Sequence, residues 1–171
     1  NYRRDQELMK YAQTDALTGL YNKETTKLRT DEILSTDKDM IHAFLILDMD
    51  CFKQINDGYG HAVGDIVLQK FGQLLRDIFR EDDIVGRIGG DEFVVVMKNI
   101  KMKEMAIAKA EELLTKTQQY EIKELNGSAI SISIGIAMAP EDGDCYMDLY
   151  KRADQALYQA KRSGKARVCG Y

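Results

Sequence analysis

Two glycines and two carboxylates, Gly89-Gly90-Asp91-Glu92, precede a run of β-branched residues. The pattern predicts a β-hairpin with the glycines at its tip, where they supply the positive φ of a tight primed turn and leave room for a bulky anion. Adjacent carboxylates repel each other unless a proton or a cation relieves them, so the pair is a candidate site for a divalent metal. A solvated acidic hairpin tip would show the same residues, and this segment alone leaves both interpretations open.

A second pair of carboxylates, Asp48 and Asp50, follows the apolar run of residues 43–47. A short continuous apolar run is typical of a central strand that is buried on both faces. Carboxylates two residues apart at a strand end point to one side, where they can coordinate Mg²⁺ together with substrate phosphates. An aspartate at a strand end is also common as a turn or cap residue, so this spacing alone does not identify a metal site.

Several segments, far apart but in a fixed order, resemble the GGDEF domain family, the diguanylate cyclases of bacterial second-messenger signalling. They begin at Asp15 (DALTGLYNK), Asp48 (DMDCFKQINDGYGHAVGD), Gly89 (GGDEF), Ser131 (SISIGIA) and Ala153 (ADQALYQAKRSGK). Lys23 stands where the family usually has Arg, and Ala166 stands where Asn is usual. The resemblance spans residues 15–168, which is nearly the whole chain.

The resemblance implies an α/β (α+β) fold with a palm-like, mainly antiparallel central sheet flanked by helices, as in class III nucleotide cyclases. The apolar periodicity is compatible with this fold and predicts helices over residues 23–34, 64–80, 102–119 and 146–163.

A second hairpin is expected around Asn126-Gly127, because this dipeptide favours a tight primed turn. Its strands would be residues 121–124 and 128–139. The second of them alternates isoleucines with small residues, which predicts that the isoleucines are buried against helices.

The resemblance also implies a metal site. Two Mg²⁺ or Mn²⁺ ions per active half-site would be held by Asp48, the main-chain carbonyl of Met49, Asp91 and Glu92. Glu92 is further expected to be the catalytic base for the 3′-hydroxyl, so the same carboxylate is a candidate for two roles.

Substrate-binding residues follow from the same resemblance. The phosphates are assigned to the main chain around Cys51 and Phe52, to Lys53, Lys161 and Lys165, and to the open turn at Gly89 and Gly90. Lysines near the end of a helix also offset its dipole, so Lys161 and Lys165 would not indicate a phosphate site by themselves.

Guanine recognition is assigned to Asn56 and Asp65. Guanine presents N1–H and its 2-amino group as adjacent donors, and an ionised carboxylate only accepts, so Asp65 suits guanine and rejects adenine. The family branch that makes mixed dinucleotides carries Ser at this position. Asp65 therefore favours strict use of GTP.

Arg80 and Asp83 match the family's RxxD element, through which many members bind their product and shut down. An Arg fork suits a phosphate or a guanine edge. Without the family resemblance, an Arg and an Asp three residues apart would be interpreted as a surface ion pair.

The implied reaction is the condensation of two GTP into cyclic di-GMP with release of two pyrophosphates. Since one domain binds one GTP, activity is expected from a homodimer, with cyclic di-GMP as product and inhibitor. One alternative is a catalytically silent module that binds GTP or cyclic di-GMP, and the intact GGDEF string, Asp48 and Lys161 count against it. Another is a cyclase with a cyclic mononucleotide or mixed dinucleotide product, and Asp65 counts against the mixed product.

Composition narrows the possible partners, metal sites and cellular location of the chain. The chain has 171 residues, of which 44% are hydrophobic and 30% charged, and its net charge of −4 argues against broad binding to a nucleic acid polymer. Its 3 cysteines form no CxxC, so neither a disulfide framework nor a zinc site is indicated and a cytoplasmic location is expected. No apolar run approaches a membrane span, so no membrane contact is expected of this segment.

The chain begins with Asn1 rather than Met, as expected of a segment of a longer protein, and a membrane anchor upstream is left open. Residues 1–13 are interpreted as a linker helix from an upstream domain and residues 14–171 as the GGDEF domain. A simple N-terminal cap helix is the alternative for residues 1–13, and the sequence does not separate the two.

Overall fold

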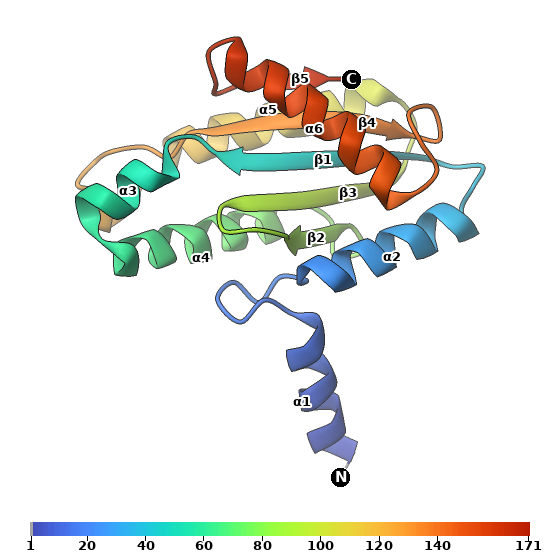
Figure 1. The fold of residues 1–171 in the computed structure, drawn as a ribbon, viewed down its shortest axis with the longest axis horizontal. Helices are drawn as coiled ribbons and strands as arrows, with labels where there is room; N and C mark the ends of the chain where they lie inside the picture. Colours follow the sequence, from blue (N-terminus) through green and yellow to red (C-terminus); the bar gives the residue numbers. More distant parts are fainter. Residues whose placement is uncertain (1) are drawn as a thin grey trace.

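The computed structural model describes residues 2–171. Its elements, drawn in Figure 1, are α1 (Tyr2–Gln13), α2 (Lys23–Thr36), β1 (Ile41–Met49), α3 (Phe52–Tyr59), α4 (His61–Ile78), β2 (Ile84–Arg87), β3 (Glu92–Ile100), α5 (Lys103–Gln119), the 3₁₀-helix η1 (Lys123–Leu125), β4 (Ile132–Ala139), α6 (Tyr146–Arg162) and β5 (Val168–Gly170). The strands form one sheet in the order β2-β3-β1-β4-β5. All neighbours are antiparallel except β4 and β5, which confirms the expected mainly antiparallel sheet flanked by helices.

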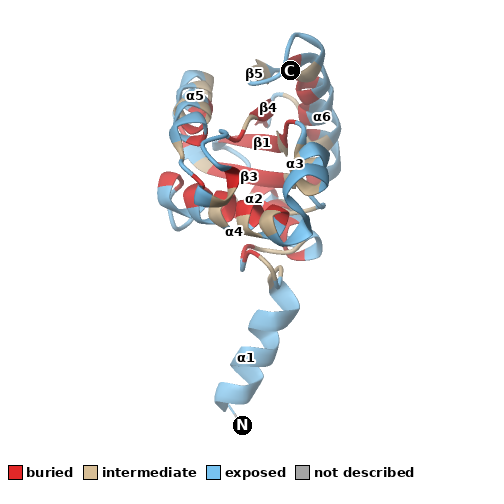
Figure 2. Ribbon diagram, turned by 90° about the vertical axis from the view of Figure 1, so that its left-hand side faces the viewer, coloured by how far each residue is buried: buried red, intermediate tan, exposed pale blue. Residues whose placement is uncertain are grey.

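Strand β1 runs through the centre of the sheet and is buried on both faces, as its apolar run predicts. Phe44 and Ile46 join a core with residues of α2 and α6, whereas Leu45 and Leu47 face the opposite core with residues of α4 and α5. Figure 2 shows the buried strands between α5 on one side and α6 on the other. The period of two along a strand therefore explains why the sheet needs helices on both faces.

The alternation along β4 is also confirmed. Ile132, Ile134 and Ile136 belong to the core on the α4 and α5 side. The small residues between them face α6, and Gly135 lies against the main chain of that helix. The small side chains let α6 pack closely on the sheet, which brings the residues on its inner face within reach of β1 and β3.

The predicted strand over residues 121–124 is wrong. Ile122 and Leu125 are both buried, at 2% and 1% exposed, and their spacing of three residues fits the 3₁₀-helix η1 rather than a strand. Asn126 and Gly127 do adopt positive φ angles of 50° and 85°, but they end η1 instead of joining two paired strands.

The predicted conformation of Gly89 and Gly90 is wrong as well. The glycines with positive φ in the described chain are Gly19, Gly60, Gly127 and Gly164. β2 and β3 are joined by residues 88–91, a longer connection than the two-residue loop that needs a primed turn. The expected room beside the glycines is present, since a Cβ at Gly90 would meet no atom within 4 Å.

Three further features concern the helices and the edge strand. Helix α3 and strand β5 were not predicted, and they extend the structure around the C-terminal ends of β1 and α6. Helix α1 buries none of its residues and projects away from the sheet (Figures 1 and 2). Within residues 2–171, every helix is too short or too polar to span a bilayer.

Candidate functional site

Three of the predicted acidic residues meet where β1 ends and β3 begins. Asp48 pairs with Glu92 across the two strands, and the Met49 amide donates to the carbonyl oxygen of Asp91 at 3.3 Å. The β2–β3 connection and α3 lie at this same end of the sheet (Figure 1). Antiparallel pairing thus brings together carboxylates that are more than 40 residues apart in sequence.

Asp48 is held by a cation from the far end of α6. The Lys161 ammonium donates a hydrogen bond to Asp48 Oδ2, whereas Asp48 Oδ1 is buried and has no hydrogen-bond partner among the described residues. Burial raises the pKa of Asp48 above its ordinary value; the bond from Lys161 opposes that rise, and the charge of Asp91 adds to it. The protein therefore neutralises the negative charge of an ionised Asp48 only in part.

Glu92 receives a hydrogen bond that sequence reasoning missed. The Tyr150 hydroxyl, on α6, donates to Glu92 Oε1 at 2.7 Å. Burial raises the pKa of Glu92, the Tyr150 bond opposes the rise, and the charges of Asp48 and Asp154 add to it. The signal available in the sequence was spacing, because Tyr150 lies eleven positions before Lys161 and so falls on the same face of the helix after three turns.

The arrangement fits a divalent cation. Hard oxygen ligands suit Mg²⁺ and Mn²⁺. Beside the carboxylates of Asp91 and Glu92, Asp48 offers a buried oxygen that no other described residue bonds. Burial raises the pKa of both Asp48 and Glu92, and a neighbouring carboxylate adds to each rise, Asp91 for Asp48 and Asp48 for Glu92. A bound cation would oppose this rise.

Asp50 does not join this group, contrary to the expectation from its spacing. Its carboxylate is 6% exposed and accepts hydrogen bonds from Ser131 Oγ at 2.5 Å, Ser133 Oγ at 2.7 Å and the Ala166 amide at 3.1 Å. Asp50 therefore ties β1 to β4 and to the turn after α6. The residue lies beyond the last residue of β1, so the alternation of a strand no longer sets its direction.

Two of the predicted phosphate-binding residues, Cys51 and Lys165, lie side by side. The Lys165 ammonium is 3.5 Å from Cys51 Sγ, and both residues line a pocket of about 350 Å³ between α3 and the turn after α6. Phe52 packs against the core, and Lys53 is exposed. Lys161 instead contacts Asp48, so its ammonium lies at the acidic group.

The predicted guanine-binding residues lie on neighbouring helices. Asn56 is on α3 and Asp65 is on α4, and the Asn56 side chain lies against Gly64, where a Cβ would be 1.9 Å from Asn56 Oδ1. Gly64 therefore gives the amide room directly beside Asp65, whose carboxylate is exposed. The Asn56 amide therefore lies against the residue that precedes Asp65.

Arg87 links the Gly-Gly connection to the start of the domain, a second contact that sequence reasoning missed. Its guanidinium donates to the Gly90 carbonyl at 2.8 and 3.1 Å and to the Asp15 carboxylate at 3.1 and 3.2 Å. Burial raises the pKa of Asp15, but hydrogen bonds from Thr18 and the Arg87 charge outweigh it and hold the pKa below its ordinary value. The ion pair between Arg87 and Asp15 therefore ties the β2–β3 connection, which contains Asp91, to the start of the domain.

Arg80 and Asp83 lie apart from the acidic group. The buried Asp83 carboxylate accepts from the main-chain amides of Arg80 and Lys98, both at 3.1 Å, while the Arg80 side chain is 54% exposed. They line a pocket of about 380 Å³ together with Gly19, Tyr21, Arg76 and Phe79. Asp83 therefore shapes the loop. The Arg80 guanidinium donates to the Lys98 carbonyl at 3.1 Å, and its Nε lies 3.8 Å from the Asp83 carboxylate.

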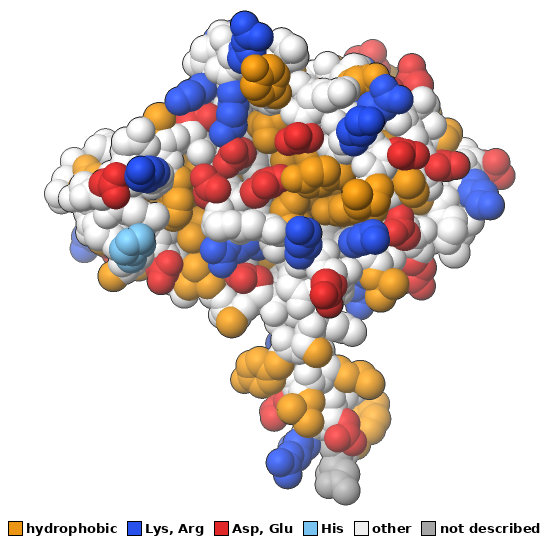
Figure 3. All heavy atoms as spheres, in the orientation of Figure 1, with side chains coloured by type: hydrophobic (Ala, Val, Ile, Leu, Met, Phe, Trp, Pro, Cys, Tyr) orange, Lys and Arg blue, Asp and Glu red, His pale blue; other side chains and the backbone are white. Residues whose placement is uncertain are grey.

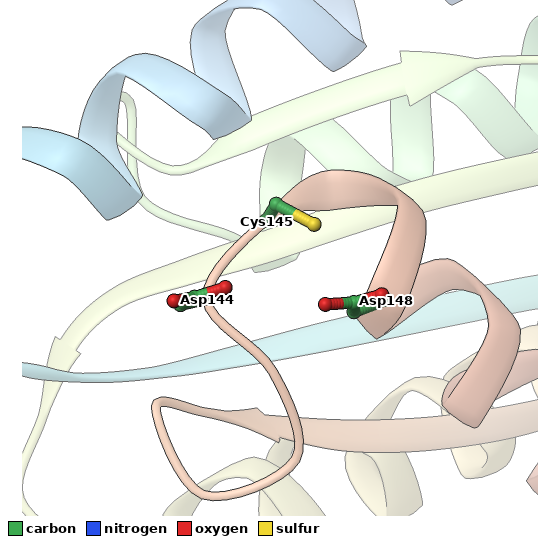
Figure 4. Close-up of side chains that lie close together, drawn as sticks. All are labelled: Asp144, Cys145 and Asp148. Carbon is green, nitrogen blue, oxygen red and sulfur yellow. The ribbon is translucent and has the colours of Figure 1, made fainter.

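One further group of potential ligands was not predicted. Asp144, Cys145 and Asp148 lie at the N-terminal end of α6, with their ligand atoms within 4.8 Å of one another (Figure 4). Acidic residues at this position stabilise a helix through its dipole.

Figure 3 shows acidic side chains bordered by lysine and arginine on the face that α6 crosses.

The geometry can be compared with known proteins. Residues 12–167 match the family described as diguanylate cyclase, GGDEF domain. Diguanylate cyclase DgcS of Shewanella oneidensis is 37% identical over 163 residues, covering 94% of this chain and 53% of its own length. The uncharacterized protein YhcK of Bacillus subtilis is 37% identical over 163 residues, covering 92% and 45%.

A solved structure agrees with the fold. The coiled coil and GGDEF domain of DgcB from Caulobacter crescentus, in complex with c-di-GMP, matches with a TM-score of 0.90 at 25% identity, covering 99% of this chain and 91% of that one. The chain spans about half the length of the curated relatives that it matches.

Proposed function

Because the chain belongs to the GGDEF domain family of diguanylate cyclases, we propose that it condenses two GTP into cyclic di-GMP and two pyrophosphates. The observation that carries this proposal is the meeting of Asp48, Asp91 and Glu92 beside a buried carboxylate oxygen that has no hydrogen-bond partner within residues 2–171. The reaction needs little beyond positioning and charge neutralisation, and this group supplies sites for both.

The acidic group would hold two Mg²⁺ or Mn²⁺ ions through Asp48, the Met49 carbonyl, Asp91 and Glu92. Bound metal would supply charge neutralisation at the phosphates and a lower pKa for the attacking hydroxyl. Glu92 would accept the proton of the 3′-hydroxyl as the general base.

The substrate would lie along the open side of this group. Lys161, Lys165, Lys53 and the main chain at Cys51 and Phe52 would bind the phosphates, with room left by Gly89 and Gly90. Asp65 would accept hydrogen bonds from the guanine N1–H and 2-amino group and so exclude ATP, and Asn56 would bind the same base. The contact between Asn56 and Gly64 supports a shared guanine site.

Catalysis would require two chains, because each 3′-hydroxyl attacks the α-phosphorus of the other GTP. We assign residues 1–13 to a linker and residues 14–171 to the cyclase domain. Helix α1 supports this division, because its apolar residues Leu8, Met9 and Tyr11 are exposed at 59, 67 and 78% and a second copy could cover them. Figure 3 shows hydrophobic side chains on the projecting helix.

The function is tested by incubating the purified chain with GTP and Mg²⁺ over a wide range of protein concentrations and resolving the nucleotides by chromatography. Since two chains must meet, the rate of cyclic di-GMP formation is expected to rise more than proportionally with protein until the dimer saturates. ATP assayed in parallel is expected to give no cyclic product. Rates proportional to protein at every dilution would contradict the dimeric mechanism, and GTP binding without product would favour the silent module.

Arg80 is expected to mediate product inhibition. In Arg80→Ala the exposed guanidinium fork is lost, while the buried contacts of Asp83 with the main chain remain. Cyclic di-GMP should therefore inhibit the variant at least about tenfold more weakly, since a charged hydrogen bond contributes about 1.5–3 kcal/mol. The measurement is the initial rate against added cyclic di-GMP, with Lys98→Ala, whose main-chain groups remain in place, as the control. Unchanged inhibition in Arg80→Ala would remove Arg80 from the inhibitory site.

A further inference from the structure

Helix α6 contacts the acidic group at two points, only one of which the family motifs contain. Lys161 reaches Asp48 from the C-terminal end of the helix, and Tyr150 reaches Glu92 from its first half. The two residues are eleven positions apart, or about 16 Å along the helix axis. The paired residues of β1 and β3 are therefore each held by a side chain from the same helix face.

The Tyr150 hydroxyl is held firmly in place. Its ring stacks on Tyr146 with centroids 5.9 Å apart and an angle of 25° between the rings. Tyr146 is 3% exposed and meets Phe44 of β1 edge to face at 5.3 Å. An aromatic stack anchored on the central strand limits the positions that the Tyr150 hydroxyl can take.

The bond also decides which oxygen of Glu92 is available. Tyr150 occupies Oε1, whereas Oε2 is turned back over the Gly-Gly connection, 3.7 Å from where a Cβ of Gly89 would lie. Tyr150→Phe would leave this carboxylate free to rotate. A carboxylate in one orientation is a better ligand and base than a rotating one, because its ordering cost is already met.

We propose that Tyr150 is a positioning residue that fixes the Glu92 carboxylate, so that one oxygen is held by the protein and the other is presented to the metal and the substrate. This inference rests on the proposed function of the site and adds a residue that the family motifs do not include. Tyr150 acts through Glu92 and need not touch the substrate.

The test is Tyr150→Phe, which keeps the ring and its stack and removes only the hydroxyl. The rate constant kcat is expected to fall about tenfold while the KM for GTP changes less than about twofold, as for the loss of one hydrogen bond to a charged group. Tyr158→Phe is the matched control, because Tyr158 lies on the same helix but is 58% exposed and outside the site. It should behave as wild type.

A binding measurement tests the inference without turnover. Mn²⁺ is titrated by electron paramagnetic resonance in the presence of 3′-deoxy-GTP, which lacks the attacking hydroxyl. Tyr150→Phe is expected to bind Mn²⁺ several-fold more weakly than wild type. In a Glu92→Gln background the same substitution should cause no further loss, because its effect passes through the carboxylate.

The outcomes separate the two proposals. If wild type makes no cyclic di-GMP, the proposed function fails, whereas the Mn²⁺ titration still decides the role of Tyr150. The inference is overturned if kcat and Mn²⁺ affinity both stay within about twofold of wild type. It is equally overturned if Tyr150→Phe weakens Mn²⁺ binding as much in the Glu92→Gln background as in wild type, since Tyr150 would then act by another route.

Discussion

Glu92→Ala is expected to lower the rate of cyclic di-GMP formation by about 10³-fold or more while the chain stays folded. The substitution removes a general base, which contributes about 10²–10⁴-fold, and a metal ligand at the same time. The fold should tolerate the substitution because Glu92 is the first residue of β3 and its side chain is only half-buried. The main-chain pairing of this position with Asp48 would remain intact.

The measurement is the chromatographic assay at a protein concentration where wild type is active, with circular dichroism to confirm the fold. Glu104→Ala, an exposed glutamate in the first turn of α5, is the control for a lost negative charge. Substantial turnover by Glu92→Ala would remove Glu92 from both proposed roles. Loss of the folded signal would instead assign the residue a structural role.

Gly135→Ala is expected to destabilise the protein by about 3 kcal/mol, the upper range for an overpacked core. The new Cβ would lie 2.1 Å from the Ala153 carbonyl oxygen and 2.4 Å from the Leu157 amide nitrogen. Both atoms belong to the main chain of α6, so no side-chain rotation relieves the clash. The helix would have to move away from β4, taking Tyr150 and Lys161 with it.

Urea unfolding followed by circular dichroism measures the change in the free energy of unfolding. Gly58→Ala is the matched control, because a Cβ at this position of α3 would meet no atom within 4 Å and the stability should change by less than about 1 kcal/mol. We further expect Gly135→Ala to lose cyclase activity even where it remains folded. Wild-type stability in Gly135→Ala would show that α6 has room to shift on the sheet.

Helices and strands were predicted from the sequence more fully than the contacts of the site. The helices over residues 23–34, 102–119 and 146–163 were predicted within two residues of α2, α5 and α6, and the apolar run of β1 is buried on both faces. These features are local, because periodicity alone determines which side chains a helix or strand buries. The Asn22 cap of α2, which accepts from the Thr25 amide at 3.0 Å, is equally local.

The failures were short segments in which local preference is weak. Residues 121–124 carry too few apolar positions to separate a strand from the 3₁₀-helix that forms there. At Gly89 and Gly90 the dipeptide suggested a primed turn, but the four residues between β2 and β3 remove the need for one. At the two glycines, the length of the connection between β2 and β3 therefore overrode the preference of the dipeptide.

The sequence by itself determined the chemistry of this protein: which carboxylates, lysines and glycines are available, and at the end of which element each one stands. Only the tertiary structure decided how they are used. Asp50 turned to Ser131 and Ser133, more than 80 residues away, Tyr150 bonded Glu92 across 58 residues, and Arg87 met Asp15 across 72. The reason is physical, because spacing along the chain sets the face on which a side chain lies, whereas strand order and the packing of α6 on small residues set what lies opposite.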